Sequence, residues 1–101
     1  MTKVFISQPM KGKIEQEILE ERANIFQLAK ESFPDAEMID SYFEDYKPST
    51  GNIALKYLAK SLELLADADV AYFATGWQEA RGCRIENECA IAYGIEVHEL
   101  Y

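Results

Sequence analysis

The chain has 101 residues, 49% of them hydrophobic and 28% charged, which is the size and composition of one globular domain spanning residues 1–101. Its formal net charge of −8 argues against nucleic acid as a partner, because an acidic surface repels phosphate backbones. No apolar run approaches the length of a membrane span and no secretory leader is recognisable. We therefore expect no membrane partner and a cytoplasmic location.

The cysteine and histidine content argues against disulfides and metals. Cys83 and Cys89 lie six positions apart on one expected helix, on different faces and too far apart to bridge, which suggests reduced thiols. His98 is the one histidine, and no cysteine or histidine pair has metal-ligand spacing. We expect no metal site and no cofactor.

The first forty residues predict a strand, a helix and a second strand. An apolar run over residues 3–7 predicts a strand, and the loop over 8–12 contains a proline and a glycine. Apolar residues at helical spacing predict an amphipathic helix over 13–32, which Pro34 ends. A short second strand is expected over 36–40.

The middle of the chain contains an aromatic loop and a strongly apolar helix. Residues 41–51 include Tyr42 and Phe43, which either cover a pocket or pack on the core. Helix 52–66 is apolar over more than one face. In so small a protein, the second apolar face predicts contact with another subunit and hence a homodimer or higher homo-oligomer.

The last third predicts a strand, a loop, a helix and a fourth strand. The buried strand covers 70–74, and the loop 75–82 contains two glycines. A helical pattern begins at Cys83, and Gly94 is suited to end it. Residues 95–100 alternate apolar and polar side chains, as in an edge strand.

Strands alternating with helices predict an α/β fold, a small doubly wound, flavodoxin- or Rossmann-like domain with a parallel four-stranded sheet and three main helices. The expected strand order is 2-1-3-4. In such sheets ligands bind where the order reverses, beyond the carboxyl ends of adjacent strands. The loop 8–13 and the segment 75–86 would then share one mouth.

Glu86 is the candidate catalytic carboxylate at this mouth. It follows Gly82 by four positions, which predicts a place in the first helical turn, where the helix N-terminus favours the charged form. Glu88 is the second catalytic candidate, but it lies about 200° further round the helix. The alternative is that both are ordinary first-turn glutamates. The expected ligand-binding residues are Ser7, Gln8, Pro9, Met10, Lys11, Gly12, Trp77, Arg81, Gly82 and Arg84.

Two of these groups have specific expected roles. Arg81 and Arg84, with Lys11, can hold a phosphate on an otherwise acidic chain, or the arginines can pair with neighbouring glutamates in solvent. Trp77 can line the pocket, or it can pack on a neighbouring helix or subunit.

Three segments resemble a known family. Residues 6–12 (Ile-Ser-Gln-Pro-Met-Lys-Gly), 68–73 (Ala-Asp-Val-Ala-Tyr-Phe) and 82–90 (Gly-Cys-Arg-Ile-Glu-Asn-Glu-Cys-Ala) resemble the nucleoside 2-deoxyribosyltransferase-like superfamily, and most closely a branch of small phage and bacterial domains. The resemblance covers nearly the whole chain. It implies recognition of a nucleoside or nucleotide, and cleavage or exchange of the N-glycosidic bond.

The resemblance also implies a nucleophile. Active members use the glutamate of a Gly-x-x-x-Glu-x-Gly-x-Ala pattern. Gly82, Glu86 and Ala90 match that pattern, whereas Glu88 replaces its second glycine. Glu86 would thus form a glycosyl-enzyme intermediate, as in retaining glycosidases. Glu88, or an aspartate from the loop after the second strand, would be the acid.

Two positions differ from active family members. Phe5 stands in place of a tyrosine and Ser61 in place of an aspartate, so we expect slow or absent turnover of ordinary deoxynucleosides. Two further hypotheses stay open. One is non-catalytic binding or sequestration of a nucleotide signal of the ADP-ribose type, and the other is a protein-interaction module with no small-molecule ligand.

Overall fold

The computed structural model describes residues 1–43 and 45–101. Its four strands form one parallel sheet in the order β2-β1-β3-β4, so the predicted fold class and strand order are confirmed. The elements in chain order are β1 (Thr2–Ser7), α1 (Glu15–Ser32), β2 (Ala36–Met38), α2 (Ile53–Leu65), β3 (Val70–Phe73), the 3₁₀ turn η1 (Trp77–Glu79), α3 (Arg81–Ala92) and β4 (Glu96–Glu99).

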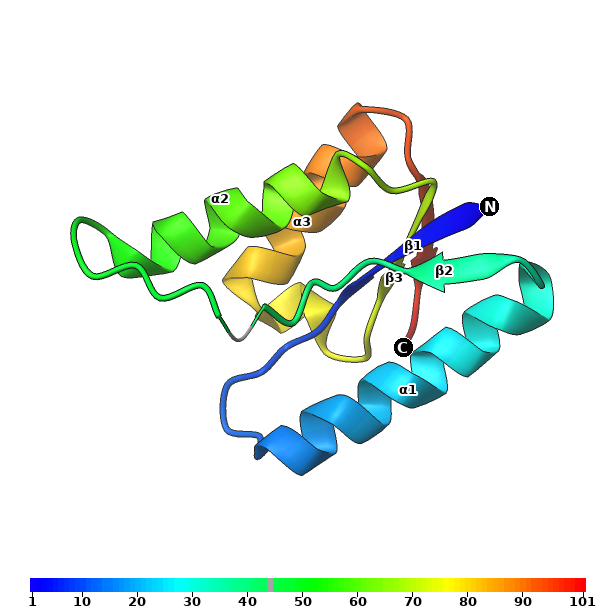
Figure 1. The fold of residues 1–101 in the computed structure, drawn as a ribbon, viewed down its shortest axis with the longest axis horizontal. Coiled ribbons are helices and arrows are strands. Elements are labelled where there is room, and N and C mark those ends of the chain that lie inside the picture. Colours follow the sequence, from blue (N-terminus) through cyan, green and yellow to red (C-terminus); the bar gives the residue numbers. More distant parts are fainter. Residues whose placement is uncertain (44) are drawn as a thin grey trace.

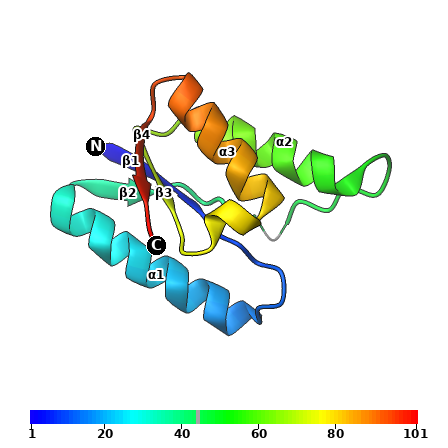
Figure 2. The ribbon, with the colours of Figure 1, turned by 180° about the vertical axis from the view of Figure 1, so that it is seen from behind.

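The helices cover the two faces of the sheet unequally. Helix α1 lies on one face, and α2 and α3 lie side by side on the other (Figures 1 and 2). Successive residues of a strand point to opposite faces, so each central strand contributes to two cores. The side chains that face α1 are Val4, Ile6, Val70, Tyr72 and Ala74. Those that face α2 and α3 are Phe5, Ala71 and Phe73.

The third helix begins earlier than the sequence pattern predicts. It starts at Arg81 rather than Cys83, and part of the expected 75–82 loop is the 3₁₀ turn η1. The periodicity of apolar residues begins only at Cys83, which is why the first turn was not recognised. The end of α3 is as predicted. Gly94 has φ +76°, and the N–H groups of Gly94 and Ile95 bond back to the carbonyls of Ile91 and Ala90 in a Schellman motif.

Strand β2 is shorter than predicted, since it ends at Met38 rather than residue 40. The amide of Ile39 still bonds to the Val4 carbonyl, but the chain then turns, with the Ser41 amide bonding to the Ile39 carbonyl. This turn carries the following loop away from the sheet edge and over the carboxyl end of β1.

The register of β1 and β3 brings their following loops together. Ser7 pairs with Phe73 at the ends of the two strands, and the Ala74 amide bonds to the Ser7 carbonyl at 2.9 Å. Both chains leave the sheet at this level. The switch point of the sheet is therefore where the sequence analysis expected it.

Helix α2 leaves much apolar surface uncovered. Leu65 is its one buried residue, whereas Ile53 and Leu55, the second of them 58% exposed, face solvent. None of the described helices is long and apolar enough to cross a membrane.

We propose that the outer face of α2 packs against a second copy of the chain, because its exposed leucine and isoleucine lose contact with water there. Light scattering should then give at least twice the monomer mass for the wild type. Leu55→Glu should return the monomer mass. The control is Leu28→Glu on α1, which changes another exposed leucine and should leave the mass unchanged. A monomeric wild type at micromolar concentration contradicts the proposal.

Candidate active site

A cleft of about 1070 Å³ opens where the loops after β1 and β3 diverge. Helix α2 and the loop before it form one wall, and the N-terminal turns of α3 form another. This volume is large enough for a nucleotide. Of the residues expected to bind ligand or act in catalysis, those lining the cleft are Ser7, Gln8, Pro9, Met10, Lys11, Arg81, Gly82 and Glu86.

Glu86 is held at the bottom of this cleft by two serine hydroxyls. Its side chain is 7% exposed. The Ser7 hydroxyl donates to Oε1 at 2.6 Å, and the Ser61 hydroxyl donates to Oε2. One carboxylate therefore joins β1, α2 and α3.

Each element places its residue here for a local reason. Ser7 is the last residue of β1 and points, like Phe5, to the face covered by α2 and α3. Ser61 shares the inward stripe of α2 with Leu58, Leu62 and Leu65, spaced by three or four positions as on one helix face. The family resemblance leads us to expect an aspartate at position 61. The serine found there donates a hydrogen bond to Glu86 and carries no charge.

The electrostatic expectation for Glu86 needs correction. Because α3 starts at Arg81, Glu86 lies in the second helical turn rather than the first. Burial raises the pKa of the Glu86 carboxyl, and the hydrogen bonds from Ser61 and Ser7 counter only part of that effect. Desolvation thus outweighs the helix N-terminus, whose influence falls off within one turn.

Cys83 lies against the same cluster and lines the cleft. Burial raises the pKa of its thiol to about 11, so it is protonated at neutral pH and is a poor nucleophile. Cys83 and Cys89 are both free thiols.

A buried arginine fixes two walls of the cleft. Arg22 of α1 is 4% exposed and donates to Gln8 Oε1 at 3.0 Å and to the Ser41 hydroxyl. Ser41 in turn donates to the Ile6 carbonyl, and Gln8 Nε2 donates to the Ile18 carbonyl. The Gln8 amide is therefore engaged within the protein, which makes it a support of the cleft wall more than a ligand contact.

Sequence reasoning did not identify Arg22, although a signal was present. Arg22 falls on the buried stripe of α1, with Ile18, Ile25 and Ala29 at helical spacing. A charged residue at such a position needs internal hydrogen-bond acceptors, because burying an unpaired charge is costly. The stripe could have shown that need, but it could not have shown which loops supply the acceptors.

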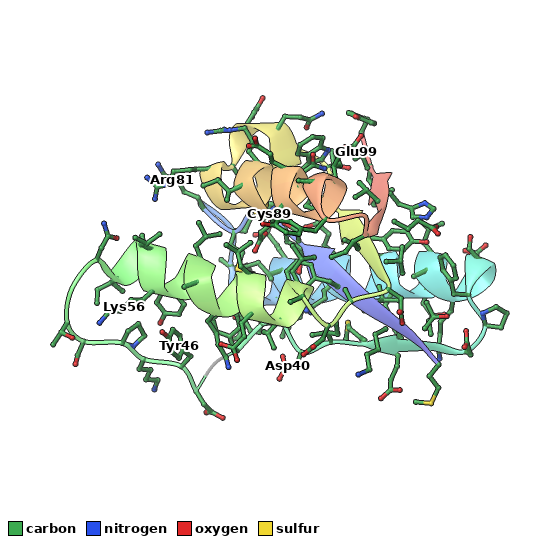
Figure 3. All side chains as sticks on the ribbon, turned by 90° about the horizontal axis from the view of Figure 1, so that it is seen from above. Asp40, Tyr46, Lys56, Arg81, Cys89 and Glu99 are labelled. Atoms are coloured by element: carbon green, nitrogen blue, oxygen red, sulfur yellow. The ribbon has the colours of Figure 1, made fainter. Side chains whose placement is uncertain are left out.

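The cations separate into two groups. Lys11 and Arg81 are exposed at the cleft rim, and Figure 3 shows Arg81 projecting from the N-terminal end of α3. Lys13 also lines the cleft and pairs with Glu21 at 3.3 Å. Arg84 lies outside the described lining and donates to the Gln78 carbonyl of η1 at 3.0 Å. The structure thus brings Lys11 and Arg81 to the cleft without Arg84.

Aromatic rings form the wall opposite these cations. Phe43 and Tyr57 line the cleft and stack, with centroids 5.9 Å apart and planes inclined by 15°. Tyr46, which lies beside α2 in Figure 3, meets both rings edge-on. Tyr42 lines the cleft as well, so the structure places both Tyr42 and Phe43 on the cleft wall. Glu44 of the same loop lies outside the described residues.

Three further predicted site residues do not reach the described lining of the cleft. Gly12 is exposed in the loop before α1, and Glu88 is exposed on the far side of α3 from Glu86. Trp77 packs on Phe73, with ring centroids 5.8 Å apart, in the core beneath α2 and α3. Its indole Nε1 is buried and, within residues 1–43 and 45–101, has no hydrogen-bond partner.

Comparison with protein-family models finds no match, and neither does comparison with curated proteins. The resemblance to the nucleoside 2-deoxyribosyltransferase-like superfamily therefore depends on the three sequence segments alone.

The raised pKa of Glu86 predicts a pH-dependent cost to stability. The folded-state pKa lies above the unfolded value of about 4.3. The contribution of the protonated Glu86 carboxyl to the free energy of unfolding is therefore fully present below that value and is lost as pH rises through the folded pKa. Glu86→Gln should therefore be more stable than wild type at about pH 8, with a smaller difference at about pH 5. Urea unfolding at both pH values measures this. Glu88→Gln, at an exposed site, should show the same small change at both, and a Glu86→Gln effect independent of pH contradicts the assignment.

Proposed function

We propose that this protein recognises a nucleoside or nucleotide in the cleft and that Glu86 can attack the anomeric carbon of its N-glycosidic bond. The observation that carries the proposal is the buried Glu86 carboxylate between the Ser7 and Ser61 hydroxyls. A carboxylate at this depth can stabilise an oxocarbenium-like centre and then bond to it. The Gly82–Glu86–Ala90 spacing of the resembling family supports the same residue.

The surroundings of Glu86 fit the three parts of a nucleotide. Phe43 and Tyr57 offer aromatic surface for a base, which stacks on such rings at about 1–3 kcal/mol per base. Lys11 and Arg81 at the rim offer charge for a phosphate. Gly82 of α3 also lines the cleft, and a Cβ added there meets no atom within 4 Å, so a ligand can approach its backbone.

Non-catalytic binding is the second candidate, and a specific observation favours it. Ser61 replaces the acid of active family members, so Glu86 has neutral partners, and neither Asp40 nor Glu88 lines the described cleft. A binder of an ADP-ribose-type nucleotide would use the same rings and cations. The free thiols fit the reducing cytoplasm expected for either activity.

The phosphate role of the rim predicts a difference between ligands. Calorimetry should show a nucleoside monophosphate binding more tightly than its nucleoside, because Arg81 adds a charge-assisted hydrogen bond. Arg81→Ala should weaken monophosphate binding by about tenfold or more and leave nucleoside binding nearly unchanged. Arg84→Ala is the control, since that side chain is engaged by the Gln78 carbonyl. Equal affinities for nucleoside and monophosphate in the wild type would exclude the phosphate role.

The nucleophile assignment predicts a contrast between two glutamates. Any hydrolysis or transfer should fall by at least about 10³-fold in Glu86→Ala, and Glu86→Gln should retain binding. Glu88→Ala should keep wild-type activity, because Glu88 is exposed away from the cleft. Loss of activity in Glu88→Ala with retention in Glu86→Ala would reverse the assignment. Binding without measurable turnover in every form would select the non-catalytic candidate.

A further inference from the structure

The partners of Glu86 are unusual for a glycosidic nucleophile. Both carboxylate oxygens accept serine hydroxyls, from Ser7 and Ser61. Retaining glycosidases place a second carboxyl group about 5 Å from the nucleophile, where it protonates the leaving group. In the described part of the cleft the other carboxylate is Glu79, an exposed residue of η1. The bottom of the cleft therefore supplies a nucleophile whose hydrogen-bond partners are neutral.

Two other titratable side chains that line the cleft, Cys83 and Lys13, are poorly suited to protonate a base. Burial raises the pKa of the Cys83 thiol to about 11, far from the operating pH that general acid catalysis needs. Lys13 is paired with Glu21 at 3.3 Å. A neutral purine or pyrimidine leaves as an anion unless it is protonated, so it is a poor leaving group in such a site.

We propose that the cleft cleaves N-glycosides whose base carries a positive charge, of the pyridinium nucleotide class, because Glu86 has two serine hydroxyls and, among the described residues, no second carboxyl group as its partners. This inference rests on the proposed function and specifies its substrate. A cationic ring takes the electron pair of the breaking bond and leaves as a neutral molecule, so it needs no proton.

The charges and rings of the cleft independently suit a cation. Phe43 and Tyr57 form a stacked aromatic wall, and the face of such rings attracts a cationic group. Glu86 lines the same cleft, and its hydrogen-bond partners in the described part of the chain include no cationic side chain. A bound positive ring favours the charged form of Glu86, so the substrate itself opposes the effect of burial. Lys11 and Arg81 remain at the rim for the phosphate.

The reaction balances without a further reagent. In the first step a Glu86 carboxylate oxygen bonds to C1′ while the bond from C1′ to the ring nitrogen breaks, and its electron pair neutralises the ring. In the second step a water oxygen bonds to C1′, the ester bond breaks with its electron pair returning to Glu86, and the water proton passes to solvent. The products are the free neutral base and a ribose phosphate.

The test uses two substrates that share a ribose 5′-phosphate and differ in the charge of the base. Wild-type protein is incubated with nicotinamide mononucleotide or with inosine 5′-monophosphate, and the free base is quantified by chromatography against a protein-free blank. Nicotinamide should be released at least about tenfold faster than hypoxanthine. Its rate should not fall above neutral pH, because no general acid is lost. Glu86→Gln should abolish release and Glu88→Gln should leave it unchanged.

Several outcomes overturn the inference. The inference is wrong if hypoxanthine is released as fast as nicotinamide, or if the rate of nicotinamide release falls at alkaline pH. It is also wrong if the Glu86→Gln variant still releases nicotinamide. Calorimetry with the same two nucleotides separates this failure from failure of the proposed function. If both nucleotides bind and neither is cleaved, nucleotide recognition stands and the cationic substrate class is wrong. If neither binds, both proposals are wrong.

Discussion

The hydrogen bonds that Glu86 accepts from Ser7 and Ser61 are the contact on which the shape of the cleft depends. They join β1, α2 and α3 at one buried carboxylate. Helix α2 packs on the core through Leu62, Leu64 and Leu65, and Ser61 adds a polar contact to that apolar packing. The orientation of α2, which forms a wall of the cleft, is thus also tied to a polar contact with a buried carboxylate. A ligand bound at Glu86 would therefore affect the position of that wall.

The sheet explains why polar groups gather at this place. The central strands are buried on both faces, so the apolar run Val4–Ile6 and the strand Val70–Phe73 leave no room for polar side chains along their length. Ser7 is the first position at which β1 can present a hydroxyl, because the strand ends there. The loops that follow supply Lys11 and the turn into α3. The chemistry is confined to one end of the sheet by the burial of the rest.

Much of the fold could be predicted because the signals are local. Apolar runs, helical periodicity and the glycine after α3 each belong to one segment, and their alternation determines the strand order. The position of Glu86 in the cleft followed from the same topology. The resemblance singled out position 61, but the contact of Ser61 with Glu86 could not be predicted from spacing, since it spans 25 positions and depends on how α2 is rotated. Trp77 and Arg84 were assigned to the pocket because η1 was not recognised, and η1 directs Trp77 onto Phe73 and offers Arg84 the Gln78 carbonyl.

The serine at position 61, where the resembling family has an acid, affects the charge that Glu86 can carry. An acid beside Glu86 would share a proton with it, because two carboxylates in contact cannot both ionise easily. A serine hydroxyl donates a hydrogen bond and does not ionise near neutral pH. The negative charge of ionised Glu86 is then not opposed by a second carboxylate beside it. That charge is expensive in a buried position and most favourable when a cation enters the cleft. The cost to folding and the proposed preference for a positively charged ligand therefore have the same physical origin in one buried carboxylate.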